Sequence, residues 1–389
     1  MKKVSRKTNF ILYISVIIFS VIFVLLGYIY CTKNTVSEST ETAPETYKAR
    51  AEEIISDNEI FSKYTNEIIE RRVVYYATIL NGDKKGEKIV ATQIMDLTQM
   101  ELGKPVTPNS VHFVSIVTNE YMENQWITGN PVRTPWILFL VILFCSLVLL
   151  FGRGKGVNTI IALIITCLAV FFILIPAITE GKNIYITTVI ICIFTIISTL
   201  LLVGGLSFKT LSASLGCIGG VSIAGIITVV SNYYMQMTGM LDDDSLMIYV
   251  MNPNRPIDLR AILFAGIIIG AMGAVMDVGM SISSSLEEII SKVADISFVE
   301  IIKSGFSIGR DIMGTMANTL VLAYIGSGLH MTVLLLNYKG NLEEILNMEM
   351  IASEILQAMA GSIAILFTIP STTLFTAFLQ KKFLRKQKK

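Results

Sequence analysis

The stretch that decides the fold runs Gly266-Ile-Ile-Ile-Gly270-Ala-Met-Gly273-Ala-Val-Met-Asp277-Val-Gly-Met-Ser281-Ile-Ser-Ser. It lies in an apolar run, residues 261–283, that is long enough to cross a bilayer as a helix. At 3.6 residues per turn its glycines share one face with an aspartate and a serine. Small residues four apart let a neighbouring helix approach closely. We therefore predict a membrane helix with a helix-packing face that also carries polar groups, namely Gly266, Gly270, Gly273, Asp277 and Ser281.

Apolar runs of similar length recur along the chain. Hydrophobic residues make up 53% of the 389 residues and charged residues 16%, whereas a soluble domain is about 25% charged. Because each run approaches the roughly 20 residues that a spanning helix needs, we predict an all-α polytopic membrane bundle of about eight transmembrane helices. The predicted spans are Phe10–Tyr30, Trp136–Phe151, Asn158–Ile175, Ile184–Leu202, Leu211–Tyr234, Ala261–Ser283, Ile312–Leu336 and Ile351–Leu379.

A second polar stretch opens the seventh predicted span. It reads Gly309-Arg310-Asp311-Ile-Met-Gly314-Thr-Met-Ala-Asn318-Thr, and Asp311, Gly314 and Asn318 share a face at helical spacing. If consecutive spans alternate in direction, Asp277 and the Arg310–Asp311 pair lie at similar depth. We expect the two helices to pack, with Asp277 facing Arg310 or Asn318.

Two interpretations of these polar residues remain open. Polar groups inside membrane helices are costly, and they usually face the bundle or a water-filled cavity. An Asp–Arg pair that only sets helix register would explain them structurally. We favour an ion site, a proton site or a substrate path, because small, acidic and amide residues converge on two adjacent spans. The predicted site consists of Asp277, Ser281, Arg310, Asp311 and Asn318, with Gly266, Gly270, Gly273 and Gly314 as packing positions.

The distribution of basic residues predicts the orientation. Lysine and arginine favour the cytoplasmic side, and here they cluster at both ends of the chain and in the loops on one side of the eight-span arrangement. We expect both termini in the cytoplasm and residues 1–31 to be an uncleaved anchor. Residues 32–134 then form an exposed domain outside the membrane, and residues 135–389 form a seven-helix membrane domain with a basic tail.

The exposed segment has the composition of a soluble domain. Apolar positions in residues 47–70 suggest a short helix, while Val73–Leu80, Lys88–Met95 and Ser110–Thr118 alternate as strands do. The turn Asn81-Gly82-Asp83 joins the first two of these strands. We expect a small extracytoplasmic β-rich domain, barrel-like in form, with His112 in a structural role.

Both polar stretches resemble the YibE/F family of bacterial membrane proteins. The likeness rests on residues 270–281 and 309–326 and is supported by Arg153-Gly154-Lys155-Gly156, Ile175-Pro176 and Ile369-Pro370. It covers roughly residues 130–380 and implies a multi-span membrane protein with no settled activity. Members of the family tend to carry Leu where Met272 stands and Thr near Ser281, which are conservative differences.

These features favour a transporter or transporter component, proton- or cation-coupled through Asp277 and Asp311. The alternative is a scaffold or regulator whose outer domain binds an envelope protein. An intramembrane aspartyl protease fits poorly, because neither aspartate lies in a Tyr-Asp or Gly-x-Gly-Asp motif. We expect no enzymatic activity, no cofactor, no metal site and no nucleic-acid partner, since the chain has no P-loop, no CxxC pair and a net charge of only +1. The expected partners are the lipid bilayer and either a second copy or an envelope protein.

Overall fold

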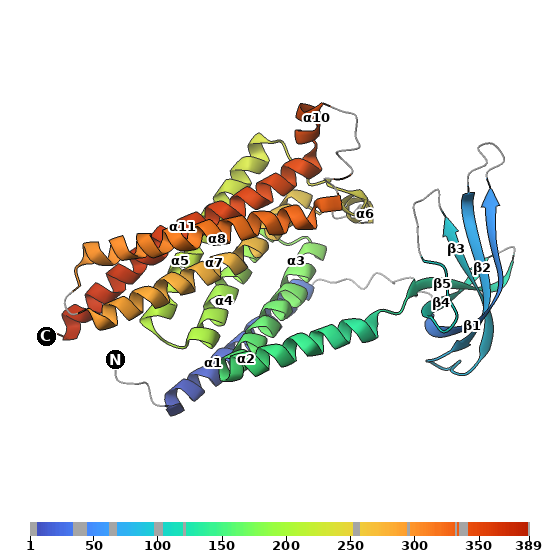
Figure 1. Ribbon diagram of the computed structural model, residues 1–389, viewed down its shortest axis with the longest axis horizontal. Helices are drawn as coiled ribbons and strands as arrows, with labels where there is room; N and C mark the ends of the chain where they lie inside the picture. The colour runs from blue at the N-terminus through green and yellow to red at the C-terminus, as the bar shows by residue number, and fades with distance from the viewer. Residues whose placement is uncertain are drawn as a thin grey trace. The chain divides into compact units, whose positions relative to one another are not determined.

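The chain forms two compact units. The computed structural model describes residues 6–33, 45–61, 68–96, 104–119, 122–251, 257–293, 296–330, 333 and 341–387. One unit comprises residues 36–147, and the other comprises residues 1–35 with residues 148–389. The first unit contains a β-barrel and the second a helical bundle (Figure 1).

Five strands close the barrel. They are β1 (Thr46–Phe61), β2 (Ile68–Ile79), β3 (Lys88–Asp96), β4 (Val111–Asn119) and β5 (Met122–Pro131). The order is β1-β2-β3-β5-β4, with β1 also paired to β4 and with β3–β5 as the parallel pair. Register shifts in β1 between Ala51 and Glu53 and between Ile54 and Ser56 let this long strand bend and pair on both sides. This is the strand order of an OB-fold barrel.

The expected helix in residues 47–70 is wrong, because residues 46–61 are strand β1. Tyr47, Ala49 and Ala51 point into the barrel while the residues between them do not. Alanine is only weakly apolar, so the alternation of these three residues does not stand out in the sequence. The isoleucines that follow are spaced as in a helix, although they belong to the same strand. The strands at residues 73–80, 88–95 and 110–118 are confirmed as β2, β3 and β4, while β5 was not anticipated.

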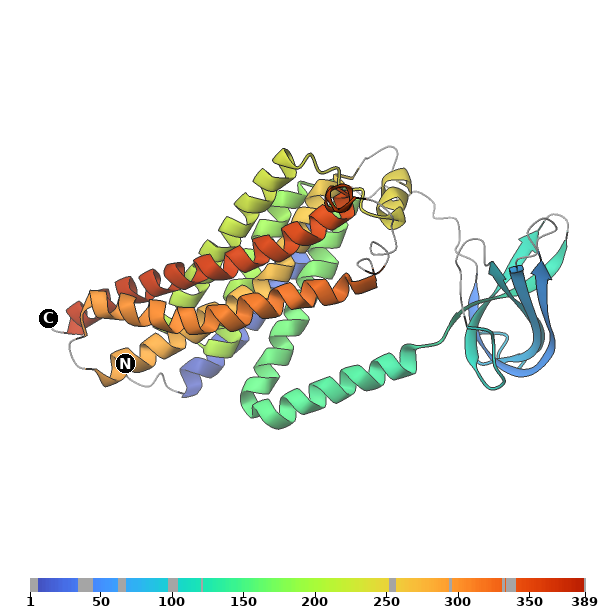
Figure 2. The same cartoon turned by 45° about the horizontal axis from the view of Figure 1, so that its top comes forward.

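The helical unit is built on long helices. These are α1 (Arg6–Thr32), α2 (Thr134–Ala169, of which residues 148–169 belong to this unit), α4 (Ile184–Gly204), α5 (Phe208–Tyr234), α7 (Leu259–Lys292), α8 (Phe298–Ser327) and α11 (Glu349–Gln387). Shorter elements are a π-helical turn η1 (Val170–Leu174), α3 (Ile175–Thr179), α6 (Asp243–Met251) and α10 (Leu342–Leu346). Figures 1 and 2 show α5, α7, α8 and α11 side by side.

Six helical segments of the described chain are long and apolar enough to cross a membrane, so the expected eight spans are not confirmed. The second and third predicted spans both lie in the segment Thr134–Thr179, which consists of two helices separated by a kink at Arg153, where the backbone is not helical. The predicted span at residues 312–336 falls largely in α8, whose charged and polar residues lower its mean hydropathy. The six segments are Ile11–Thr32, Thr134–Thr179, Ile184–Gly204, Phe208–Tyr234, Leu259–Lys292 and Glu349–Leu379.

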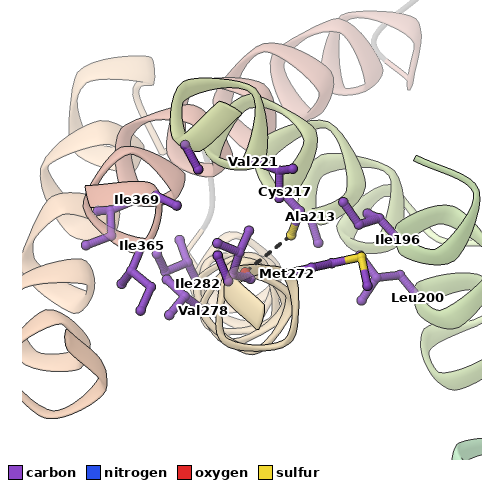
Figure 3. Close-up of a cluster of buried hydrophobic side chains, with 14 of the residues drawn as sticks. Ile196, Leu200, Ala213, Cys217, Val221, Met272, Val278, Ile282, Ile365 and Ile369 are labelled. Atoms are coloured by element: carbon purple, nitrogen blue, oxygen red, sulfur yellow. Dashed lines mark hydrogen bonds between the residues drawn. The ribbon is translucent and has the colours of Figure 1, made fainter. Parts of the chain in front are cut away.

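The main core of the bundle surrounds α7. Figure 3 shows Ile196 and Leu200 of α4 on one side of α7 and Ile365 and Ile369 of α11 on another. The Cys217 thiol of α5 donates a hydrogen bond to the Val275 carbonyl oxygen of α7, at 3.4 Å. A second cluster joins α1, the end of α2, η1 and α3 to α4 and the start of α7. As the central helix, α7 positions the predicted site.

Glycines bring α5 and α11 into close contact. A Cβ on Gly216 would collide with Thr372, and one on Gly220 would lie 2.8 Å from the Ala364 carbonyl oxygen. A Cβ on Gly279 of α7 would lie 2.5 Å from the Cys217 sulfur. Backbones can approach in this way only where side chains are small. These contacts fix how α5, α7 and α11 pack.

Candidate functional site: an open polar face on α7 and α8

Helix α7 is stabilised by a capping residue at its start and by buried apolar residues along its length. The Asp258 side chain caps it by accepting hydrogen bonds from the backbone N–H groups of Arg260 and Ala261. Apolar residues that recur at helical spacing then bury most of its circumference. Around these apolar residues α7 packs against α4, α5 and α11. Met280 contacts Gly204 of α4, and Gly279 contacts Cys217 of α5. One stripe of α7 remains outside these contacts.

That stripe is the small and polar face predicted from the sequence. All five of its residues are exposed, from the glycines to Asp277 and Ser281. A Cβ on Gly266 or Gly273 would meet nothing within 4 Å, so no helix of the described chain packs there. Gly270 differs, because a Cβ there would lie 2.7 Å from the Tyr324 hydroxyl of α8. Within the described chain, α8 therefore contacts this face at Gly270, while no residue covers it at Gly266 or Gly273.

Helix α8 presents a second exposed polar stripe. It starts at a capping box in which the Ser297 and Glu300 side chains each accept from the other residue's backbone N–H. Gly305 and Gly309 press it against α11, where they meet Thr373 and Ile369. The opposite side of α8 carries the remaining predicted site residues. Arg310, Asp311, Gly314 and Asn318 are all exposed, and a Cβ on Gly314 would also meet nothing within 4 Å.

The two stripes lie at matching levels of an antiparallel helix pair. Asp277 is 15 residues before Lys292, where α7 ends, and Asp311 is 13 residues after Phe298, where α8 begins. At a rise of about 1.5 Å per residue, these residues lie roughly 22 Å and 20 Å from the connecting turn. The helices contact each other. Even so, no ion pair in the described part of the chain includes Asp277, Arg310 or Asp311.

Paired charges lie instead near the connecting turn. Lys209 at the start of α5 approaches Glu287 of α7, with 3.4 Å between Nζ and Oε2. Lys292 binds Glu288 one helical turn earlier, at 2.6 Å. These contacts join charges at one end of the bundle. They leave the charges at the level of Asp277 without a partner among the described residues.

Two polar clusters of the helical unit, one beside this face and one far from it, were not predicted from the sequence. The Tyr324 hydroxyl of α8 and the Gln357 amide nitrogen of α11 both lie beside Gly270, 2.7 Å and 3.7 Å from where its Cβ would be. Tyr324 belongs to the quoted family stretch, which was the only signal available for it. At the far end of the bundle, Glu349 accepts hydrogen bonds from the backbone N–H groups of Thr238 and Gly239 and from the Thr238 hydroxyl.

Among the described residues, no three or more His, Cys, Asp or Glu side chains lie close enough together to hold a metal ion. In the barrel, His112 is buried, and its Nε2 lies 3.1 Å from the Ser110 hydroxyl. Burial lowers the pKa of this imidazole. A buried, neutral histidine with a hydroxyl partner fits the structural role expected for it.

The fold and this face together define a polytopic membrane protein, whose described residues include six candidate membrane helices and a five-stranded barrel near the start of the chain. The sequence model of the YibE/F-like protein family matches residues 140–382, which is more than half of the chain. The chain therefore belongs to that family, as the two polar stretches indicated. Neither a curated protein nor a solved structure matches it.

Proposed function

We propose that this protein is a transporter or a transporter component, coupled to protons or a cation through Asp277 and Asp311. One observation carries the proposal. Asp277 stays exposed in the middle of α7, a helix that is otherwise apolar enough to cross a membrane. A carboxylate in that position has to be met by water, an ion or another protein group.

The energetic argument is direct. A charged side chain at the centre of a bilayer costs about 2.5–3.5 kcal/mol on insertion scales, so intramembrane carboxylates usually serve a pathway or a pair. Within the described residues no cation pairs with Asp277. Asp311 is exposed at nearly the level of Asp277, Ser281 about 6 Å nearer the connecting turn and Asn318 about 8 Å farther from it, and all three offer oxygen ligands. Hydrated cations and protons are the species that such oxygen-rich faces accept.

The proposed orientation follows from the basic residues. Both termini would lie in the cytoplasm of a bacterial cell, with the barrel outside the plasma membrane. This arrangement counts the two helices on either side of the Arg153 kink and helix α8 as separate spans, so that the Lys209–Glu287 and Lys292–Glu288 pairs would lie at the cytoplasmic end of the bundle. Asp277 would lie in the cytoplasmic half of its helix.

The test is flux through purified protein in liposomes. We expect Asp277→Asn and Asp311→Asn each to reduce proton or cation flux at least tenfold, about 1.4 kcal/mol in barrier terms, because the amide cannot ionise. A pH-sensitive dye and a panel of cations would report the flux, and size-exclusion profiles would show that the variants stay folded. Glu343→Gln is the matched control, since this carboxylate is exposed on α10, away from the face. Absence of flux in the unmodified protein would reject the proposal.

The alternative function, a scaffold or regulator that acts through its barrel, has one specific observation in its favour. Tyr76 of β2 and Val90 of β3 form a cross-strand pair on the outer surface of the barrel, and both are 47% exposed. Ile94 extends the same apolar patch along β3. Exposed apolar patches on soluble domains often mark protein contacts.

The two functions respond to different substitutions. If the barrel carries the function, Tyr76→Ser combined with Val90→Thr abolishes complementation of a deletion strain while Asp277→Asn retains it. The reverse pattern supports transport.

A further inference from the structure

The polar face of α7 and α8 lacks a covering wall. In the described bundle, α4 flanks α7 at Met280 and α8 flanks it at Gly270, while α5 and α11 pack on the opposite side. Gly266, Gly273, Asp277 and Ser281 stay exposed between these flanks. A transport path through a membrane has to be closed off from lipid on every side. One copy of this face supplies only part of such a path.

The charges on the face are complementary to a second copy of themselves. Asp277 is exposed on α7, and Arg310 is exposed on α8. Arg310 is 12 residues after Phe298, so it lies roughly 18 Å from the connecting turn, against roughly 22 Å for Asp277. The difference of about 4 Å is within the reach of an arginine side chain. The two charges therefore occupy similar depths, and neither has an ion-pair partner among the described residues.

A two-fold axis along the membrane normal leaves every depth unchanged. When α7 of one copy is set against α8 of the other, this symmetry pairs Asp277 of each copy with Arg310 of the other and gives two identical ion pairs in one self-complementary interface. The glycines on α7 then supply the close approach that such an interface needs. The guanidinium of one copy would neutralise the carboxylate of the other inside the membrane.

We propose that a second copy of this chain covers the α7–α8 face, with reciprocal ion pairs between Asp277 and Arg310 of the two copies. This inference builds on the proposed function, because it places the path between the two copies. Asp311, Asn318 and Ser281 would then line an enclosed polar seam. The interface itself is measured without any transport assay.

Charge reversal in trans tests the pairing. Asp277→Arg and Arg310→Asp, expressed singly, each place like charges opposite each other and should lose the dimer. Co-expressed with different tags, the two variants restore both opposite-charge pairs in a heterodimer, which co-purification detects. Heterodimer recovery in trans supports the proposal. Recovery only when both changes are in the same chain would mean that the pair lies within one chain, and would overturn it.

Cysteine cross-linking in membranes gives a second measurement that does not depend on charge. In a background with the five native cysteines replaced, Gly273→Cys lies on the face, where its Cβ would meet nothing within 4 Å and the side chain has room. Ser222→Cys is the matched control, because Ser222 is exposed on α5 at a similar level, 13 residues from Lys209, which meets Glu287. A short bifunctional maleimide should give a dimer band several-fold stronger from Gly273→Cys than from Ser222→Cys.

Equal bands, or none from Gly273→Cys, would overturn the proposal. A cross-linked dimer without flux would leave this interface in place and reject transport. Flux from a strictly monomeric protein would support transport and reject the interface.

Discussion

Single residues differ in what holds them. Asp277 is exposed and forms no ion pair with the described residues of its own chain. His112, in contrast, is buried in the barrel and hydrogen-bonded to Ser110. Asp57 is paired with Arg71 on the barrel surface, and that pairing lowers the pKa of its carboxyl. The titration of each group therefore reports a different part of the molecule.

His112 should make barrel stability depend on pH in a window of its own. Because burial lowers its pKa in the folded state, the unfolded chain binds the proton more readily. Stability is complete above the unfolded pKa of about 6.5 and falls as the pH drops below it. The pKa values of Asp57 and Glu52 are also lowered in the folded state. The stability that these two carboxylates provide is lost only when the pH falls below about 4–5, outside the histidine window.

The measurement is urea unfolding of the barrel between pH 7 and pH 5. It can be followed by Trp126 fluorescence in a Trp136→Phe variant, since the chain has two tryptophans. His112→Gln should remove the dependence in this window. An unchanged slope in that variant would assign the pH effect to other groups.

At the scale of elements, glycines on the same bundle have opposite roles. Gly220 lies where α5 touches α11, and a Cβ there would be 2.8 Å from a carbonyl oxygen. Gly266 lies on the open face of α7, where a Cβ would meet nothing. Spacing along a helix does not separate these two cases, since both glycines occur in small-residue stripes.

Alanine substitution should separate them. Alanine favours a helix over glycine by up to about 1 kcal/mol, so Gly266→Ala should leave the melting temperature of the purified protein unchanged or slightly raised. Gly220→Ala should lower it, because overpacking costs roughly 1–3 kcal/mol and outweighs the helix propensity. Thermal unfolding in detergent, followed by size exclusion, provides the comparison. Equal shifts would mean that Gly220 is not tightly packed in solution.

At the scale of the whole molecule, the barrel has a core of its own. Tyr75, Ala77 and Ile79 of β2 are fully buried there together with residues of β1 and β3. None of the residues in this core comes from the helical unit. A closed barrel also leaves no open sheet edge that another domain would have to cover.

Residues 36–133 should therefore fold when expressed alone. We expect a single cooperative thermal transition and a β-type circular dichroism spectrum, because the strand pairs and the core lie within this segment. Tyr75→Ala should abolish the transition, since truncating a buried aromatic costs about 3–5 kcal/mol. Tyr76→Ala, at the exposed neighbouring position, should change it little. A segment that stays unfolded would show that the barrel depends on the helices.

The amino-acid sequence by itself determined the membrane character of the chain, its family, three of the five strands and the stripe on α7 that carries Asp277. These follow from local periodicity, which a helix or a strand imposes on nearby residues. The tertiary structure alone decided that residues 46–61 form a strand and that the α7 stripe is open. Whether a face is covered depends on helices distant in the chain, such as α4, α8 and α11, and no local pattern in α7 encodes where they lie.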